Sequence, residues 1–141
     1  LESKNIDINY SNLVDPSTRI IADPEQLKKV IDNIVGNSIK YMDKPKGVIN
    51  IRILDEVDSV RVEIEDNGKG ISTKDLGKIF ERFYRTDASR NSSTGGSGIG
   101  LSIVKKIIED HGGYIWATSK DGEGTCLHFV IRKYREAEEN E

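Results

Sequence analysis

Two carboxamides, an ammonium and a phenol fall on one arc of a predicted helix. Asn33 and Asn37 are one helical turn apart, and Lys40 and Tyr41 follow after another turn. At about 100° per residue, these side chains border the apolar face of the helix. A carboxamide oxygen is a hard ligand for Mg²⁺, an ammonium can pair with phosphate oxygens, and a phenol ring can lie along a base or sugar. The pattern admits a nucleotide site, and a solvated helix surface is the alternative.

A carboxylate ends the second candidate segment. Apolar and charged side chains alternate over residues 60–64, as in a strand with one buried face. Because side chains two residues apart lie on the same face of a strand, Asp66 follows three core-facing side chains on that face. A core-facing carboxylate needs a donor such as the exocyclic amine of a purine, and Gly68 and Gly70 would let the backbone pass close to a flat ring. Thr125, at the start of a similar run, could add a hydroxyl to the same pocket. The alternative is a turn in which Asp66 caps its own backbone.

The third candidate is the glycine-rich segment 95–101, which leads directly into a predicted helix. Bare amides at a helix N-terminus attract phosphate, and glycine permits its close approach. The spacing is not the dinucleotide-binding G-x-G-x-x-G, because position 101 is Leu, and the chain contains no P-loop pattern. A flexible hinge is the alternative reading of these glycines.

Start and stop signals predict the two long helices that must position these residues. Asp23 is a helix N-cap followed by Pro24, so a helix is expected from Pro24 to about Met42. Its core face is expected to consist of Leu27, Ile31, Ile34, Val35, Ser38 and Met42. A second helix is expected from Ile99 to the glycine pair 112–113.

Alternating runs predict the sheet. The expected strands cover 6–10, 19–22, 49–53, 60–64, 114–119 and 125–131, and a short helix covers 73–80. Strands and helices without a repeating βαβ pattern predict α/β layers with a largely antiparallel or mixed sheet.

Composition excludes several classes of protein. The 141 residues, 35% of them hydrophobic, suit one domain, which we expect over residues 1–133 before a disordered acidic tail at 134–141. The net charge is −3 and the bases are dispersed, so nucleic acid is not an expected partner. No apolar run is long enough to span a bilayer, so a soluble piece is expected. The start at Leu1 suggests an excised fragment, and the single Cys126 excludes an internal disulfide and favours the cytoplasm.

Four segments, in this order, resemble the N, G1, F and G2 boxes of the ATP-binding catalytic domain of bacterial sensor histidine kinases. They are residues 33–41, 66–71, 80–85 and 96–101. That family has the Bergerat fold, which type II topoisomerases, Hsp90 chaperones and MutL share. The resemblance implies a two-layer α/β (α+β) sandwich in which a mixed, mostly antiparallel sheet of about five strands packs on about three helices.

The resemblance also implies roles for individual residues. Asn37 would ligate Mg²⁺ beside Asn33, Lys40 would contact phosphate, Tyr41 would pack near adenine, and Asp66 would accept from the adenine amino group. Phe80 and Phe83 would anchor a lid over about 84–98, and Arg85 would reach the terminal phosphates. The implied catalytic residues are Asn33, Lys40 and Arg85. The implied ATP contacts are Asn33, Asn37, Lys40, Tyr41, Asp66, Gly68, Gly70, Ile71, Phe83, Arg85, Gly96, Ser97, Gly98, Ile99, Gly100, Leu101 and Thr125.

Two residues depart from the pattern of the family. Ser38 stands where Ala is usual and Met42 where a small hydroxyl residue is usual. Both fall on the predicted core arc, so we expect altered packing there and no lost chemistry.

The function implied is the binding of Mg-ATP and the donation of its γ-phosphoryl group to a histidine on a separate dimerisation domain. Neither His111 nor His128 lies in a phospho-acceptor box, so the fragment is expected to be a monomer that does not phosphorylate itself. Its expected partners are that dimerisation domain and a cognate response regulator, within a membrane-bound parent. The alternatives are an ATPase module, which would need a Glu at position 33, a relative of the serine kinases that act on anti-sigma antagonists, and a non-catalytic nucleotide-sensing module.

Overall fold

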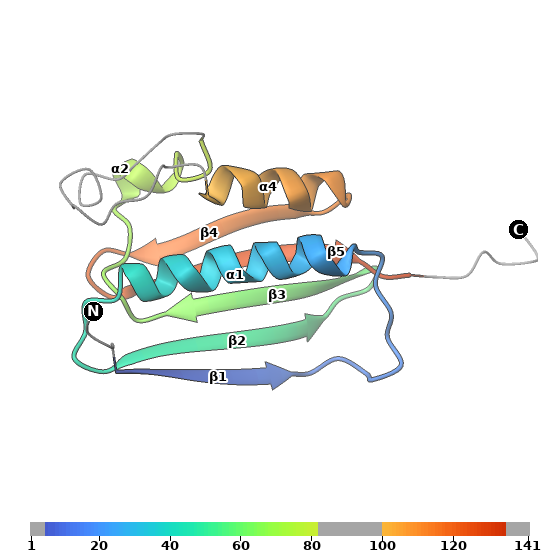
Figure 1. The fold of residues 1–141 in the computed structure, drawn as a ribbon, viewed down its shortest axis with the longest axis horizontal. Helices are drawn as coiled ribbons and strands as arrows, with labels where there is room; N and C mark the ends of the chain where they lie inside the picture. The colour runs from blue at the N-terminus through green and yellow to red at the C-terminus, as the bar shows by residue number, and fades with distance from the viewer. Residues whose placement is uncertain (1–4, 82–99, 135–141) are drawn as a thin grey trace, which may run out of the picture.

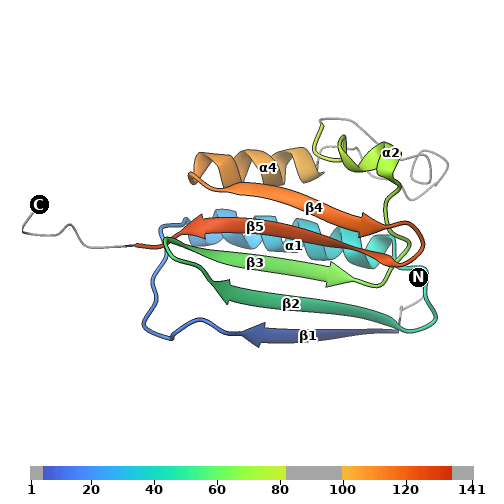
Figure 2. The same ribbon diagram turned by 180° about the vertical axis from the view of Figure 1, so that it is seen from behind.

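A computed structural model describes residues 5–81 and 100–134 of the chain. Its elements, in chain order, are β1 (Ile6–Asn12), α1 (Pro24–Lys40), β2 (Gly47–Asp55), β3 (Ser59–Asp66), α2 (Thr73–Leu76), α4 (Gly100–Asp110), β4 (Tyr114–Lys120) and β5 (Gly124–Arg132). The strands form one layer and the helices lie on one of its faces (Figure 1). Seen from behind, the other face of the sheet is in front of the helices (Figure 2).

The five strands form a mixed sheet in the order β1-β2-β3-β5-β4. Only β1 and β2 pair in parallel, and the other three pairings are antiparallel. The predicted two-layer sandwich with a mostly antiparallel sheet of five strands and three helices is therefore confirmed.

Helix α1 begins as its capping signal predicts. Oδ1 of Asp23 accepts from the amides of Glu25 and Gln26 at 3.0 and 3.4 Å, and Pro24 takes the first helical position. The helix ends at Lys40, two residues before the predicted end, because Tyr41 leaves the helical conformation while its amide still donates to the carbonyl of Asn37 at 3.1 Å.

The core lies between this helix layer and the sheet. Of the predicted core face of α1, Ile34, Ser38 and Met42 are buried, whereas Leu27, Ile31 and Val35 are half-buried. Val30, which the prediction omitted, is fully buried. The helix is therefore rotated slightly, so that the line through residues 30, 34 and 38 faces the sheet, and this rotation decides which polar residues reach the strands.

Three predicted elements differ from those observed. Residues 19–22 form no strand, and Ile20 makes only an isolated bridge to Lys133. The predicted helix over 73–80 ends at Leu76, where Gly77 follows as the C-cap. Tyr134, expected in the disordered tail, donates its amide to the carbonyl of Arg19 at 2.7 Å and lies under that guanidinium, so the described chain is still packed at this point.

Several predictions fall outside the described residues. These are the lid over 84–98, the tail from residue 135, and the site residues Phe83, Arg85, Gly96, Ser97, Gly98 and Ile99. Within 5–81 and 100–134, the longest helix is α1 with 17 residues, and none is both long and apolar enough to cross a bilayer.

Candidate functional site

Parts of the chain that are distant in sequence meet at the end of the sheet where β3 finishes. The C-terminal end of α1, the loop after β3 and the turn between β4 and β5 all lie at the left in Figure 1. The amide of Lys69 donates to the carbonyl of Tyr41 at 3.3 Å, and the amide of Gly122 donates to the carbonyl of Lys69 at 2.7 Å. This loop therefore links α1 to the β4–β5 turn.

Asp66 is half-buried at the centre of this region and is held from three sides. The hydroxyl of Ser38, on α1, donates to its Oδ2 at 2.8 Å. Its Oδ1 accepts from the amide of Gly68 at 2.9 Å and from the amide of Thr125, on β5, at 3.3 Å. The hydrogen bond from Gly68 is the local turn, in which Asp66 caps its own backbone, that the sequence offered as the alternative to base binding. The contacts from α1 and β5 go beyond a local turn, because they fix the carboxylate relative to both layers of the domain.

The glycines after Asp66 are required by close packing of the backbone. A Cβ on Gly68 would lie 3.0 Å from the carbonyl oxygen of Tyr41. Gly70 has a φ of +76°, and a Cβ there would collide with the carbonyl of Lys120. The next amide, that of Ile71, donates to the hydroxyl of Ser119 at 2.7 Å. These contacts explain the glycines without a ligand, and they also fix the loop beside the carboxylate.

Thr125 contributes to the Asp66 pocket through its backbone. Its hydroxyl lies 3.1 Å from that of Ser119. Ser119 donates its single proton to the carbonyl of Gly124 at 2.8 Å, so the Thr125 hydroxyl is the donor between the two. Thr125 therefore lies beside Asp66, but its backbone amide contacts the carboxylate and its hydroxyl, which was the predicted contribution, contacts Ser119. The sequence did not identify Ser119, whose position becomes evident only from the pairing of β4 with β5.

The polar stripe of α1 runs from its middle to its C-terminal end. The side-chain amide of Asn33 donates to the carbonyl of Lys29 at 2.9 Å. Its Oδ1 lies beside the first residue of α4, since a Cβ on Gly100 would be 3.7 Å from it. Asn37 is one turn further along α1, between Asn33 and the half-buried ring of Tyr41. The stripe therefore connects the N-terminus of α4 to the region of Asp66.

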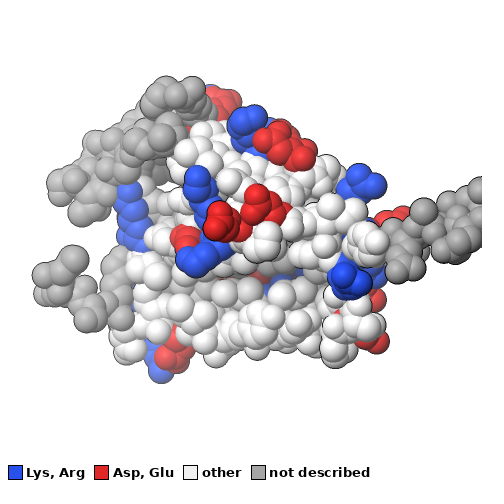
Figure 3. Space-filling view, turned by 45° about the vertical axis from the view of Figure 1, so that its right-hand side comes forward, with Lys and Arg blue, Asp and Glu red and all other residues white. Residues whose placement is uncertain are grey.

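Two ammonium groups lie near the ring of Tyr41. The Nζ atoms of Lys40 and Lys69 lie 5.4 and 6.0 Å from its ring centroid. Two cations near one aromatic ring favour an anionic ligand at this end of the domain. Acidic and basic side chains lie beside one another on the face in Figure 3. On α1, Nζ of Lys28 and Oδ2 of Asp32 form an ion pair at 2.6 Å.

The donor set fits a Mg-nucleotide by its chemistry. Oxygen ligands of the kind that Mg²⁺ prefers are offered by Asn33 and Asn37, and an acceptor for an amine is offered by Asp66. The described part of α4 begins beside Asn33 at Gly100, so the first turn that the structure describes lies next to the polar stripe. Leu101, in that same turn, packs against the core instead. Of the predicted site, the structure thus brings together the residues of α1, β3, the following loop, α4 and β5.

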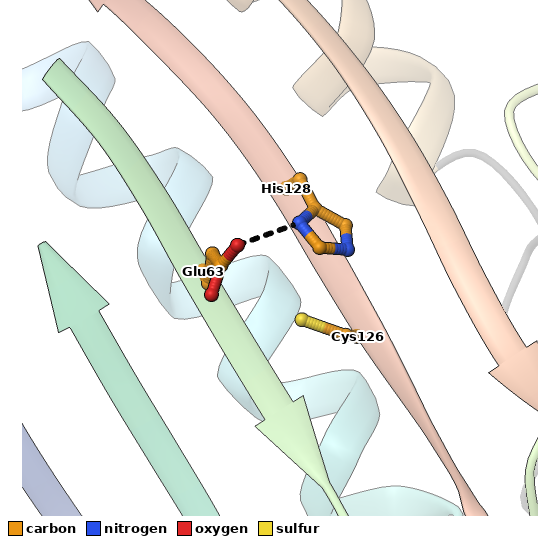
Figure 4. A group of neighbouring side chains, drawn as sticks. All are labelled: Glu63, Cys126 and His128. Atoms are coloured by element: carbon orange, nitrogen blue, oxygen red, sulfur yellow. Dashed lines mark hydrogen bonds and ion pairs between the residues drawn. The ribbon is translucent and has the colours of Figure 1, made fainter. Parts of the chain in front are cut away.

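The opposite face of the sheet carries a separate cluster, made by Glu63, Cys126 and His128 (Figure 4). Nδ1 of His128 and Oε2 of Glu63 are 3.1 Å apart, and one ligand atom from each of the three residues lies within 4.8 Å of the others. Arg52 also donates to Glu63 at 2.9 Å. Burial and the nearby carboxylates raise the pKa of Cys126 to about 12, so its thiol is protonated near neutral pH. The carboxylate of Glu63 is already paired with a guanidinium, which makes it a poor metal ligand.

Comparison with known proteins identifies the family of the chain. A family model described as histidine kinase-, DNA gyrase B-, and HSP90-like ATPase matches residues 22–135. Sensor histidine kinase WalK of Bacillus subtilis (strain 168) is 38% identical over 133 residues, which are 92% of this chain and 21% of that protein. The chain thus spans about a fifth of the length of this curated relative.

Solved structures have the same fold. The mycobacterial sensor histidine kinase MprB matches with a TM-score of 0.81 and 27% identity, over 94% of this chain and 86% of that one. Histidine kinase ThkA, solved in complex with the response regulator protein TrrA, matches with a TM-score of 0.72 and 33% identity, over 92% of this chain and 35% of that one. The chain therefore belongs to the family of histidine kinase-, DNA gyrase B- and HSP90-like ATPases, as a catalytic domain of the sensor histidine kinase type.

Proposed function

We propose that this domain binds Mg-ATP and donates the γ-phosphoryl group to a histidine on the dimerisation domain of its parent kinase. The observation that supports this most is the position of Asp66. Its carboxylate is half-buried and fixed by donors from α1, β5 and its own loop, next to the polar stripe of α1. A carboxylate held in this way is suited to accept from the exocyclic amine of adenine.

The remaining roles follow from the order of residues along α1. With the base at Asp66 and Tyr41, the phosphates would extend toward Asn37, Asn33 and the N-terminus of α4. Lys40 would neutralise phosphate charge, and Mg²⁺ held by Asn37 would supply further charge neutralisation. Phosphoryl transfer needs mainly such positioning and charge stabilisation, and little covalent chemistry from the protein.

Asn33 favours transfer to a protein over hydrolysis. An ATPase of this fold would need a general base one turn before Asn37, and the carboxamide of Asn33 is a very poor base. Its amide group is also engaged with the carbonyl of Lys29. Water at the γ-phosphate would therefore lack an activating group at this position.

The partners of the parent protein belong to the same proposal. The acceptor histidine would reside on a separate dimerisation domain, and the phosphoryl group would pass on to a cognate response regulator. The support is that ThkA, a similar kinase, was solved with a response regulator. Because ATP is the donor, we place the reaction in the cytoplasm.

The test is to mix this domain with Mg-ATP labelled at the γ-phosphate and a separately produced dimerisation domain of a sensor histidine kinase. We expect acid-labile, base-stable label on the acceptor histidine, and much less with Asp66→Asn. Phosphoserine on an added partner would support the serine-kinase alternative instead. Rapid release of phosphate without protein labelling would support the ATPase alternative.

A further inference from the structure

We infer that Ser38 is a positioning residue that sharpens the selection of a 6-amino purine by orienting the carboxylate of Asp66. This inference rests on the proposed function, because it takes Asp66 as the group that recognises the base. The residue was expected only to alter core packing. The structure instead places its hydroxyl 2.8 Å from Oδ2 of Asp66.

The hydroxyl of Ser38 is committed to this contact. The residue is 6% exposed and lies in the last turns of α1, on the side that faces the sheet. A serine in a helix can donate to the carbonyl four residues before it, but it has only one proton to give. Here that proton is directed across the layers, to the end of β3.

The contacts of Asp66 leave it one acceptor position within the described part of the chain. A carboxylate offers about four lone-pair positions. Oδ1 accepts from the amides of Gly68 and Thr125, and Oδ2 accepts from Ser38. The position that remains is on Oδ2. Because the three donors come from α1, β5 and the local loop, the carboxylate cannot turn without breaking hydrogen bonds to separate elements.

This arrangement predicts which bases are accepted. An amine at position 6 of a purine can donate to the remaining position on Oδ2. A 6-oxo group would place a carbonyl dipole against the carboxylate, and a hydrogen at position 6 would leave the acceptor unpaired. Alanine at residue 38 would free a second position on Oδ2. A water there could donate to a 6-oxo group, so discrimination between bases would weaken.

The experiment measures the dissociation constants of three nucleotides by calorimetry. They are ADP, the diphosphate of purine riboside, which has hydrogen at position 6, and inosine diphosphate. For Ser38→Ala we expect ADP to bind about fivefold more weakly, which is the size of effect expected for one hydrogen bond, while the purine riboside diphosphate binds as before. The preference for ADP over inosine diphosphate should fall by a similar factor.

Two further variants make the result specific. Ser59→Ala, at the opposite end of β3, changes another half-buried serine that is distant from Asp66 along the same strand, and all three constants should stay unchanged. Ser38→Thr keeps the hydroxyl and should restore the preference for ADP. In an Asp66→Asn background, Ser38→Ala should no longer change the ratio of the constants for ADP and purine riboside diphosphate.

Three outcomes would overturn the inference, and they differ from one another. Equal losses for all three nucleotides in Ser38→Ala would show a role in packing only. An unchanged preference in Ser38→Ala, with the wild-type chain clearly preferring ADP, would refute the role of Ser38 while leaving that of Asp66 intact. If the wild-type chain bound ADP and purine riboside diphosphate equally well, the base-reading role of Asp66 in the proposed function would fail as well.

Discussion

Asp66 and Thr125 lie directly opposite each other in the pairing of β3 with β5, and the Thr125 amide donates to Oδ1 of the carboxylate at 3.3 Å. The sheet register therefore sets which carboxylate oxygen is occupied by the backbone. Gly124, which has a φ of +137°, makes this possible, because a Cβ there would collide with the carbonyl of Asp66. The orientation of the side chain is thus a consequence of strand pairing as well as of its local turn.

Asp66→Asn should weaken ADP binding more than Lys40→Ala does. The amides that donate to Oδ1 would hold the oxygen of the new carboxamide, so its NH₂ group would face the ligand amine, donor against donor. A lost hydrogen bond to a charged group costs about 1.5 to 3 kcal/mol. Asp66 is held by three donors, whereas the long side chain of Lys40 must be ordered before it can pair with a phosphate, and an ion pair with that entropic cost contributes less than about 1 kcal/mol. Calorimetric titration of both variants with ADP measures the difference. Equal losses would contradict the argument.

Gly70→Ala should destabilise the domain, although Gly36→Ala should not. Gly70 has a φ of +76° and faces the carbonyl of Lys120, so a methyl group adds both strain and a collision. The conformational cost alone is about 1 to 2 kcal/mol. Gly36 lies inside α1 with no neighbour within 4 Å of its Cβ position, so alanine there should stabilise by about 0.5 to 1 kcal/mol. Urea unfolding of both variants tests this, and a stable Gly70→Ala would show that the loop can relax.

Sequence signals within one helical turn predicted where the long helices begin and end. Asp23 and Pro24 mark the start of α1 because capping needs only residues one turn apart. The glycine pair 112–113 ends α4 for a similar reason: Gly112 takes a φ of +77° and the amide of Gly113 donates to the carbonyl of Ile108 at 3.0 Å. The resemblance of four segments to the boxes of the sensor histidine kinases predicted the two-layer sandwich and the family of the chain, and the comparisons confirm both.

Contacts between layers could not be predicted in this way. The bond from Ser38 to Asp66 depends on the rotation of α1, which a pattern of apolar residues defines only to within a residue or so, as the omission of Val30 shows. Residues 19–22 alternate like a strand, but the chain there reaches the sheet only through the bridge of Ile20. Burial and register, rather than local propensity, decided both outcomes.

The stabilising effect of Glu63 should disappear in acid. Burial raises the pKa of this carboxyl, but the hydrogen bonds and charges of Arg52 and His128 more than offset it, so the pKa lies below its ordinary value. A lowered pKa contributes stability that is present above the unfolded-state value and is lost as pH falls through the folded-state value. Glu63→Gln should therefore be less stable than the wild-type chain at neutral pH, and the difference should shrink in acid. A difference that stays constant with pH would refute this linkage.

Glu63→Gln should leave ADP binding unchanged. Glu63 faces the side of the sheet opposite the helices, whereas Asp66 faces α1 through Ser38. Calorimetry on Glu63→Gln at neutral pH, under conditions where the domain is fully folded, measures this. A loss of affinity similar to that of Asp66→Asn would mean that the two faces of the sheet are coupled.

Cys126 should resist alkylation in the folded domain. The thiolate is the reactive species, and burial together with Glu63 and Glu65 raises the pKa of this thiol to about 12. The side chain is also 7% exposed. Iodoacetamide at mildly alkaline pH should therefore label the native chain slowly and the urea-unfolded chain quickly, as mass spectrometry can follow at this single cysteine. Fast labelling of the native chain, at the rate of the unfolded one, would show that the outer face of β5 opens readily. The raised pKa also makes stability depend on pH. As pH rises, the thiol of the unfolded chain ionises first, so the free energy of unfolding should decline.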